Sequence, residues 1–115
     1  RKSGEITEVF KGIKDCRITV ITLGLVEAWY DKVAGIYLNR SAPKNIVDAL
    51  PDRFELHVLS YDELYKATRR LIELILTRGH PEARVLLTVS PVPLLATFTD
   101  QDVITANMYS KSSLR

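Results

Sequence analysis

Residues 18–29 are Ile-Thr-Val-Ile-Thr-Leu-Gly-Leu-Val-Glu-Ala-Trp, a β-branched run that passes into a glycine, a carboxylate and an indole. A run that is apolar except for its threonines is typical of a strand covered on both faces. In open α/β sheets, ligands bind in the crevice beyond the carboxyl ends of the strands. The residues that follow this strand, Gly24 to Trp29, are therefore the first candidates for a functional site.

A second strand is predicted at Val85–Ser90, directly before Pro91-Val92-Pro93. A long helix, Tyr61–Arg78, precedes it, with a Ser60/Glu63 capping box at its start and Gly79 as the predicted left-handed cap at its end. Two buried strands joined through a helix form a βαβ crossover with parallel strands. We therefore expect a three-layer α/β fold in which Gly24 and Ser90 lie at the same edge of the sheet.

The other predicted elements are weaker. The apolar stripe Ile6, Val9, Phe10 and Ile13 predicts a short amphipathic helix. Residues 30–59 look irregular, with a small hairpin turning at Gly35, a helical turn at Ile46–Leu50 and a short strand at Phe54–Leu59. A last helix is expected from Asp100, with Thr99 as its cap and an apolar side formed by Val103, Ile104 and Met108.

Length and composition exclude several classes of protein. A chain of 115 residues is one domain, 1–115, or an internal fragment of a larger one, and we expect the latter. The net charge of +2, with Lys and Arg scattered among Asp and Glu, does not indicate nucleic-acid binding. No apolar run approaches the roughly 20 residues that span a bilayer. The single cysteine, Cys16, excludes an intrachain disulfide and suits a cytoplasmic protein. We expect no metal and no cofactor.

Glu27 and Trp29 are the strongest candidates for binding, and two interpretations remain open for each. Glu27 either accepts a hydrogen bond from a ligand or caps the following turn. Trp29 either stacks on a sugar or acyl group or covers the core with its indole N–H satisfied. Gly24 either permits the close approach of a ligand or is an ordinary turn glycine.

The remaining polar residues favour structural interpretations. Ser90 lacks the Gly-x-Ser-x-Gly elbow of a nucleophile, so it is predicted to belong to a rigid loop wall with the two prolines. His57 and His80 have no partner at metal-ligand spacing. Asn107 and Lys111 are predicted to lie on a solvated helix face with one side against the sheet edge. No Ser-His-Asp or Cys-His set emerges from these residues.

Three segments together resemble the middle of the GSCFA domain: Ile21–Trp29, Leu87–Leu94 and Ala106–Lys111. That family is similar to the SGNH (GDSL-like) hydrolases, and the resemblance implies a flavodoxin-like three-layer α/β/α sandwich. It also implies a serine nucleophile in an upstream Gly-Ser-Cys-Phe-Ala motif and a histidine base in a later Asp-x-x-His block. Neither motif occurs in this sequence. Gly24–Glu27 corresponds to the SGNH Gly-x-Asn-Asp turn, where Val26 replaces the Asn that binds the oxyanion.

The resemblance implies that this segment belongs to an esterase or acyltransferase, with carbohydrate esters or other small esters as substrates. Its reactive serine and histidine would lie outside the segment, which alone would be inactive. The residues expected to line the substrate site are Gly24, Val26, Glu27, Trp29, Ser90 and Asn107. The alternative is a non-catalytic binding or interaction domain on the same fold. Exposed sheet edges would further favour homo-oligomers or aggregates.

Overall fold

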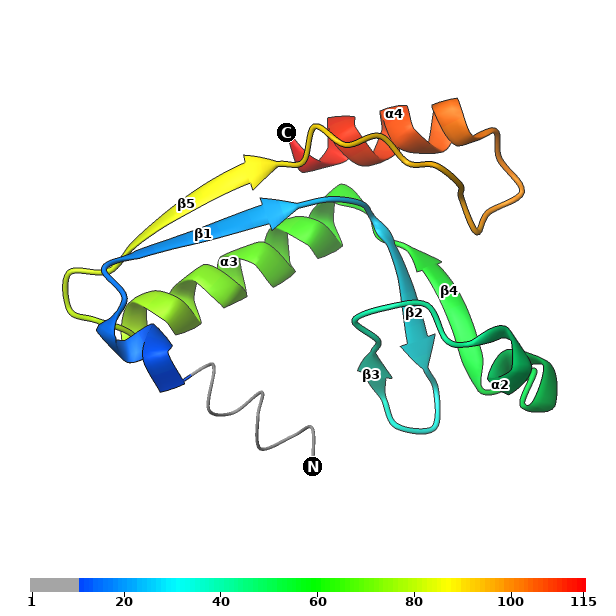
Figure 1. Ribbon diagram of the computed structural model, residues 1–115, viewed down its shortest axis with the longest axis horizontal. Coiled ribbons are helices and arrows are strands. Elements are labelled where there is room, and N and C mark those ends of the chain that lie inside the picture. The colour runs from blue at the N-terminus through cyan, green and yellow to red at the C-terminus, as the bar shows by residue number, and fades with distance from the viewer. Residues whose placement is uncertain (1–10) are drawn as a thin grey trace.

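A computed structural model describes residues 11–115 as a mixed α/β structure with two small sheets (Figure 1). The predicted helix with the stripe from Ile6 to Ile13 falls largely outside the described residues. Its last part forms a short 3₁₀ helix, η1. The elements in order are η1 (Gly12–Asp15), β1 (Ile18–Leu23), β2 (Glu27–Asp31), β3 (Ile36–Tyr37), α2 (Lys44–Ala49), β4 (Phe54–Val58), α3 (Tyr61–Arg78), β5 (Arg84–Val89) and α4 (Val103–Leu114).

The two predicted buried strands pair in parallel, as expected from the βαβ crossover. β1 and β5 are in register from Ile18 opposite Arg84 to Leu23 opposite Val89. The crossover runs through α3, which lies along one face of this sheet (Figure 1). Both strands therefore end at the same edge, as predicted for Gly24 and Ser90.

Helix α3 has the predicted bounds, Tyr61–Arg78, but the conformation of its C-terminal cap differs from the prediction. The Ser60 hydroxyl accepts from the Glu63 N–H, while the Ser60 backbone N–H and hydroxyl each donate to the Glu63 carboxylate at 2.8 Å. These bonds lower the pKa of Glu63. The prediction of a left-handed cap is wrong, because Gly79 has φ −86° and ψ −159°. Glycine is needed there for a different reason: a Cβ would lie 2.4 Å from the carbonyl oxygen of Ile75.

Only one face of the parallel sheet is covered by the described residues. Side chains alternate across a strand, and the face with Ile21 and Leu23 is partly buried beneath α3. On the opposite face Ile18, Val20 and Leu86 are 66%, 58% and 54% exposed. The expectation of a strand covered on both faces is thus not met within residues 11–115.

The segment predicted to be irregular contains a second, antiparallel sheet in the order β3-β2-β4. The predicted hairpin at Gly35 is confirmed: Gly35 has φ 67°, and its N–H donates to the Asp31 carbonyl at 2.8 Å. The predicted strand at Phe54–Leu59 is confirmed as β4. The prediction missed β2, because its pairing with β4 joins segments more than 20 residues apart.

Helix α4 begins later than predicted and presents the opposite face to the protein. Its cap is Asp102, whose Oδ1 accepts from the Ile104 N–H at 2.8 Å, so the predicted start at Asp100 with a Thr99 cap is wrong. Ser110 is buried, whereas Ile104 and Met108 are exposed. Of the predicted apolar side, Ile104 and Met108 therefore face solvent and only Val103 is half-buried, while polar side chains face the sheet edge.

Candidate functional site at the sheet edge

The carboxyl edge of the parallel sheet brings two chain segments together. The Ser90 N–H donates to the Leu23 carbonyl at 2.8 Å, so Ser90 leaves the sheet beside Gly24. The Ser90 hydroxyl accepts from the Val92 N–H at 3.2 Å, which holds the loop after β5 in a tight turn. The predicted meeting of these two strand ends follows from the strand register.

Helix α4 bridges the two segments. The Lys111 Nζ donates to the Gly24 carbonyl at 2.8 Å. The Asn107 Oδ1 accepts from the Leu94 N–H at 3.0 Å. One side chain of α4 thus contacts the loop after β1, and another, one helical turn earlier, contacts the loop after β5.

A cavity of about 350 Å³ lies between α4 and the loop after β5. We call it the edge cavity and define it by the five polar residues of its lining: Ser90, Asn107, Lys111, Ser112 and Arg115. No Asp or Glu lines it. A small ligand entering this cavity would meet side chains that donate hydrogen bonds and carry positive charge.

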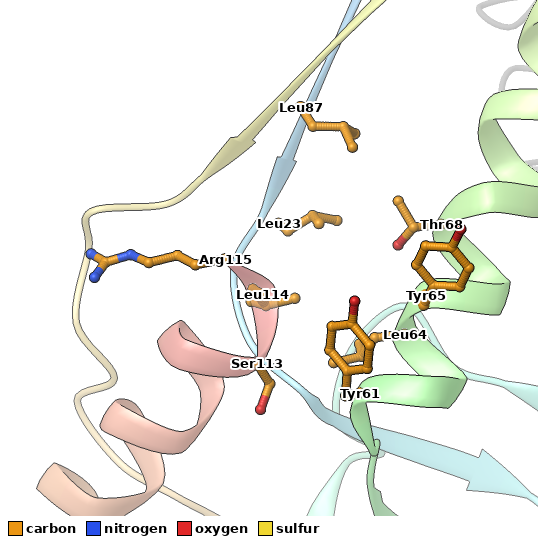
Figure 2. A pocket seen from close by; sticks show the side chains of 9 residues that line it. All are labelled: Leu23, Tyr61, Leu64, Tyr65, Thr68, Leu87, Ser113, Leu114 and Arg115. Carbon is orange, nitrogen blue, oxygen red and sulfur yellow. The ribbon is translucent and has the colours of Figure 1, made fainter.

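A second, mostly apolar cavity of about 170 Å³ lies on the covered face of the sheet (Figure 2). We call it the tyrosine cavity; Tyr61 and Tyr65 of α3 face Leu23 and Leu87 of the strands across it (Figure 2). The two tyrosine rings stack with centroids 6.2 Å apart. Leu114 of α4 closes one end. This space suits a small apolar group next to phenol hydroxyls.

Glu27 and Trp29 contact residues 97–98, in the segment before α4, and not the edge cavity. The Glu27 carboxylate accepts from the Thr97 hydroxyl and, at 2.9 Å, from the Phe98 N–H. The Trp29 ring meets Phe98 edge-on with centroids 5.6 Å apart. Glu27 therefore connects β2 to residues 97–98, which is neither of the two roles considered for it from the sequence.

Val26 lies in the interior. Its side chain is 1% exposed, and its carbonyl accepts from the Leu59 N–H at 2.9 Å. The structure thus places Ser90 and Asn107 in the lining of the edge cavity and bonds the Gly24 carbonyl to Lys111 of the same lining. It places Glu27 and Trp29 against Phe98 and the Val26 side chain in the core.

Lys111 lines the edge cavity, although it is not among the site residues predicted from the sequence. The sequence predicts it on a solvated helix face with one side against the sheet edge, whereas it is half-buried and donates to the Gly24 carbonyl. The spacing of residues along the helix could have indicated this position. The inward face of α4 follows helical periodicity and consists of Val103, Ala106, Asn107, Ser110, Lys111 and Leu114. A stripe with three polar residues is easily taken for a solvated face.

Two polar groups are buried without a hydrogen-bond partner among residues 11–115, the Trp29 Nε1 and the Ser110 hydroxyl.

The two histidines lie away from the edge cavity lining and bond to other groups: His57 Nδ1 lies 2.9 Å from the Tyr37 hydroxyl, and His80 Nδ1 accepts from the Glu82 N–H. In the described part of the chain, no three His, Cys, Asp or Glu residues gather as a metal site would require. None of its helices is both long and apolar enough to cross a bilayer.

Comparison with known proteins gives one match. The model of the GSCFA family matches residues 2–115. The chain belongs to the GSCFA family. The match covers essentially the whole of this GSCFA chain and confirms the resemblance drawn from its three motifs. No curated protein and no solved structure matches it.

Proposed function

We propose that this GSCFA chain forms one wall of an SGNH-like active site that hydrolyses or transfers ester groups on carbohydrates. The observation that carries the proposal is the edge cavity at the carboxyl ends of two parallel strands, the position where α/β sheets bind ligands. In this proposal a further layer covers the open face of Ile18, Val20 and Leu86, which completes a flavodoxin-like three-layer sandwich.

The described residues suggest distinct roles in such a site. Gly24 borders the position where a substrate carbonyl would lie, and a backbone N–H there would stabilise the charge that develops during acyl transfer. Ser90 and Asn107 line the edge cavity beside it, which would hold another part of the substrate. The tyrosine cavity offers apolar space for a small acyl group. Glu27 and Trp29 hold residues 97–98, which lead into α4 and so support the wall from behind.

The reactive serine and its base belong, in this proposal, to parts of the full-length protein outside residues 1–115. The full-length protein should hydrolyse p-nitrophenyl acetate and should lose that activity when the serine of its Gly-Ser-Cys-Phe-Ala motif becomes Ala. Ser41→Ala, in an exposed loop between β3 and α2, is the matched control and should leave the rate unchanged. Absence of activity across acyl-ester and sugar-ester panels would contradict the proposal.

A non-catalytic ligand-binding domain is the second candidate. One observation favours it: Val26, which stands where the SGNH turn has its oxyanion-binding Asn, has no side-chain donor and is buried at 1% exposure. Calorimetry with acetylated sugars separates the two functions. Binding without turnover in the full-length protein supports the binding domain.

A further inference from the structure

The amide of Asn107 has a defined orientation at the edge cavity. Its partner, the Leu94 N–H, can only donate, so the oxygen of the side-chain amide must face Leu94. The Nδ2 group therefore points the other way with two N–H donors. No hydrogen bond from Nδ2 to another residue is present within the described chain.

Ser90 and Lys111 also keep hydrogen-bond donors that no other group among residues 11–115 uses. The Ser90 oxygen accepts from the Val92 N–H, and its O–H remains available to donate. The Lys111 ammonium uses one donor on the Gly24 carbonyl, which leaves two. Asn107 and Ser90 thus use their acceptor atoms within the protein, and all three side chains keep donors available to the cavity they line.

The positive charge around the edge cavity also favours a negatively charged ligand. Lys111 and Arg115, one helical turn apart, both line the edge cavity, and the ion pairs found among residues 11–115 include neither. Figure 2 shows the Arg115 guanidinium pointing away from the tyrosine cavity, toward the chain that follows β5. Lys111 and Asn107 are half-buried, so their interactions with a bound ion are less screened than those of exposed side chains.

We propose that the edge cavity binds a small oxyanion, a carboxylate or phosphate group carried by the ligand. Donors and cations match the acceptor oxygens of such a group, no Asp or Glu side chain lines the cavity, and charge-assisted hydrogen bonds are about twice as strong as neutral ones. The inference deepens the proposed function and, for substrate choice, rests on it: the sugar ester would carry an acidic group. The anion site itself depends only on the cavity.

The test is a titration of the full-length protein, followed by NMR at the Asn107 side-chain amide and by calorimetry. The probes are inorganic phosphate, glucuronate and glucose. We expect phosphate or glucuronate to bind and glucose not to bind. The anion that binds with the higher affinity shows whether the natural group is a phosphate or a carboxylate. Equal binding of glucose and glucuronate, with no binding of phosphate, would overturn the proposal.

Asn107→Asp is the most selective variant. It keeps an oxygen that accepts from the Leu94 N–H but replaces the free donor by a negatively charged oxygen. Anion affinity should fall by about tenfold or more, the factor that corresponds to roughly 1.4 kcal/mol, about the size of one charge-assisted hydrogen bond. Asn45→Asp makes the same change at an exposed asparagine of α2, away from the cavity; it is the control and should bind as wild type. Equal affinity of Asn107→Asp and wild type would contradict the proposal, as would equal losses in both variants.

Lys111→Gln decides the question if Asn107→Asp does not fold. It keeps a donor for the Gly24 carbonyl and removes the charge, so anion affinity should fall and depend less on salt. Unchanged affinity and salt dependence in this variant would overturn the proposal. The two proposals can be refuted separately. Ester hydrolysis without anion binding would refute the anion site but not the esterase. Anion binding without hydrolysis in the full-length protein would refute the esterase but not the anion site.

Discussion

At the scale of single residues, Asp31 shows how a buried carboxylate organises the second sheet. It is 4% exposed and accepts from the Val33 and Ala34 N–H groups at 3.0 Å. The Arg53 guanidinium donates to both of its oxygens, with Nη2 2.7 Å from Oδ2. The carboxylate thus closes the turn after β2 and ties it to the residue before β4. The sequence predicted a turn here but gave no indication of a partner 22 residues away.

Asp31 should make stability depend on acid pH. Arg53 holds the pKa of Asp31 at about 2, below the ordinary 3.8. A carboxyl group with a lowered folded-state pKa stabilises the protein above its unfolded pKa, and this contribution is lost as the pH falls from about 4 toward 2. Asp31→Asn should lower the melting temperature at pH 7 and flatten its decline over that range, as measured by circular dichroism.

Asp52→Asn is the control for this prediction, because Asp52 is an exposed carboxylate next to Arg53 in the sequence. It should leave both the melting temperature and its acid dependence close to wild type. An Asp31→Asn protein with the wild-type decline below pH 4 would show that the Arg53 pair does not control acid stability.

At the scale of elements, α3 shows that the sequence marks a helix start more clearly than its end. The capping box is local, because Ser60 and Glu63 satisfy each other within one turn. The end depends on close approach: the Gly79 N–H donates to the Ile75 carbonyl at 2.8 Å with an extended backbone. A glycine after a helix favours a left-handed cap from the sequence, and only the backbone angles distinguish the two cases.

Gly79→Ala should destabilise the protein by about 1–3 kcal/mol in urea unfolding, because the new Cβ forces the backbone away from Ile75. Gly12→Ala is the matched control: a Cβ at Gly12 meets no atom within 4 Å, so its free energy of unfolding should stay within about 0.5 kcal/mol of wild type. Equal effects of the two substitutions would refute the close-contact explanation.

At the scale of the whole molecule, the open face of the parallel sheet is the main feature that invites association. Ile18, Val20 and Leu86 lie exposed on it, and the described residues provide no third strand beside β1 or β5. Exposed apolar faces and unpaired strand edges favour self-association. We therefore predict that the 115-residue chain forms dimers or larger species in solution.

Val20→Lys should shift the chain toward monomer in light scattering at equal concentration, because it places a charge in the centre of this face. Val33→Lys introduces the same charge at a valine that is 77% exposed in the turn between β2 and β3, and should leave the size distribution unchanged. A wild-type chain that is monomeric at every concentration would refute the prediction.

The sequence by itself determined the family, the parallel pairing of β1 with β5 and the span of α3, because β-branched runs, periodicity and capping boxes act locally. It also placed Gly24 beside Ser90, since parallel strands end at one edge. The tertiary structure alone decided that Glu27 bonds to Thr97 and Phe98, 70 and 71 residues away, and that Lys111 faces Gly24. The tertiary structure also decided that the polar stripe of α4 faces the sheet edge and not solvent. Such contacts depend on how distant elements pack, and periodicity cannot tell a polar face that lines a cavity from one that faces water.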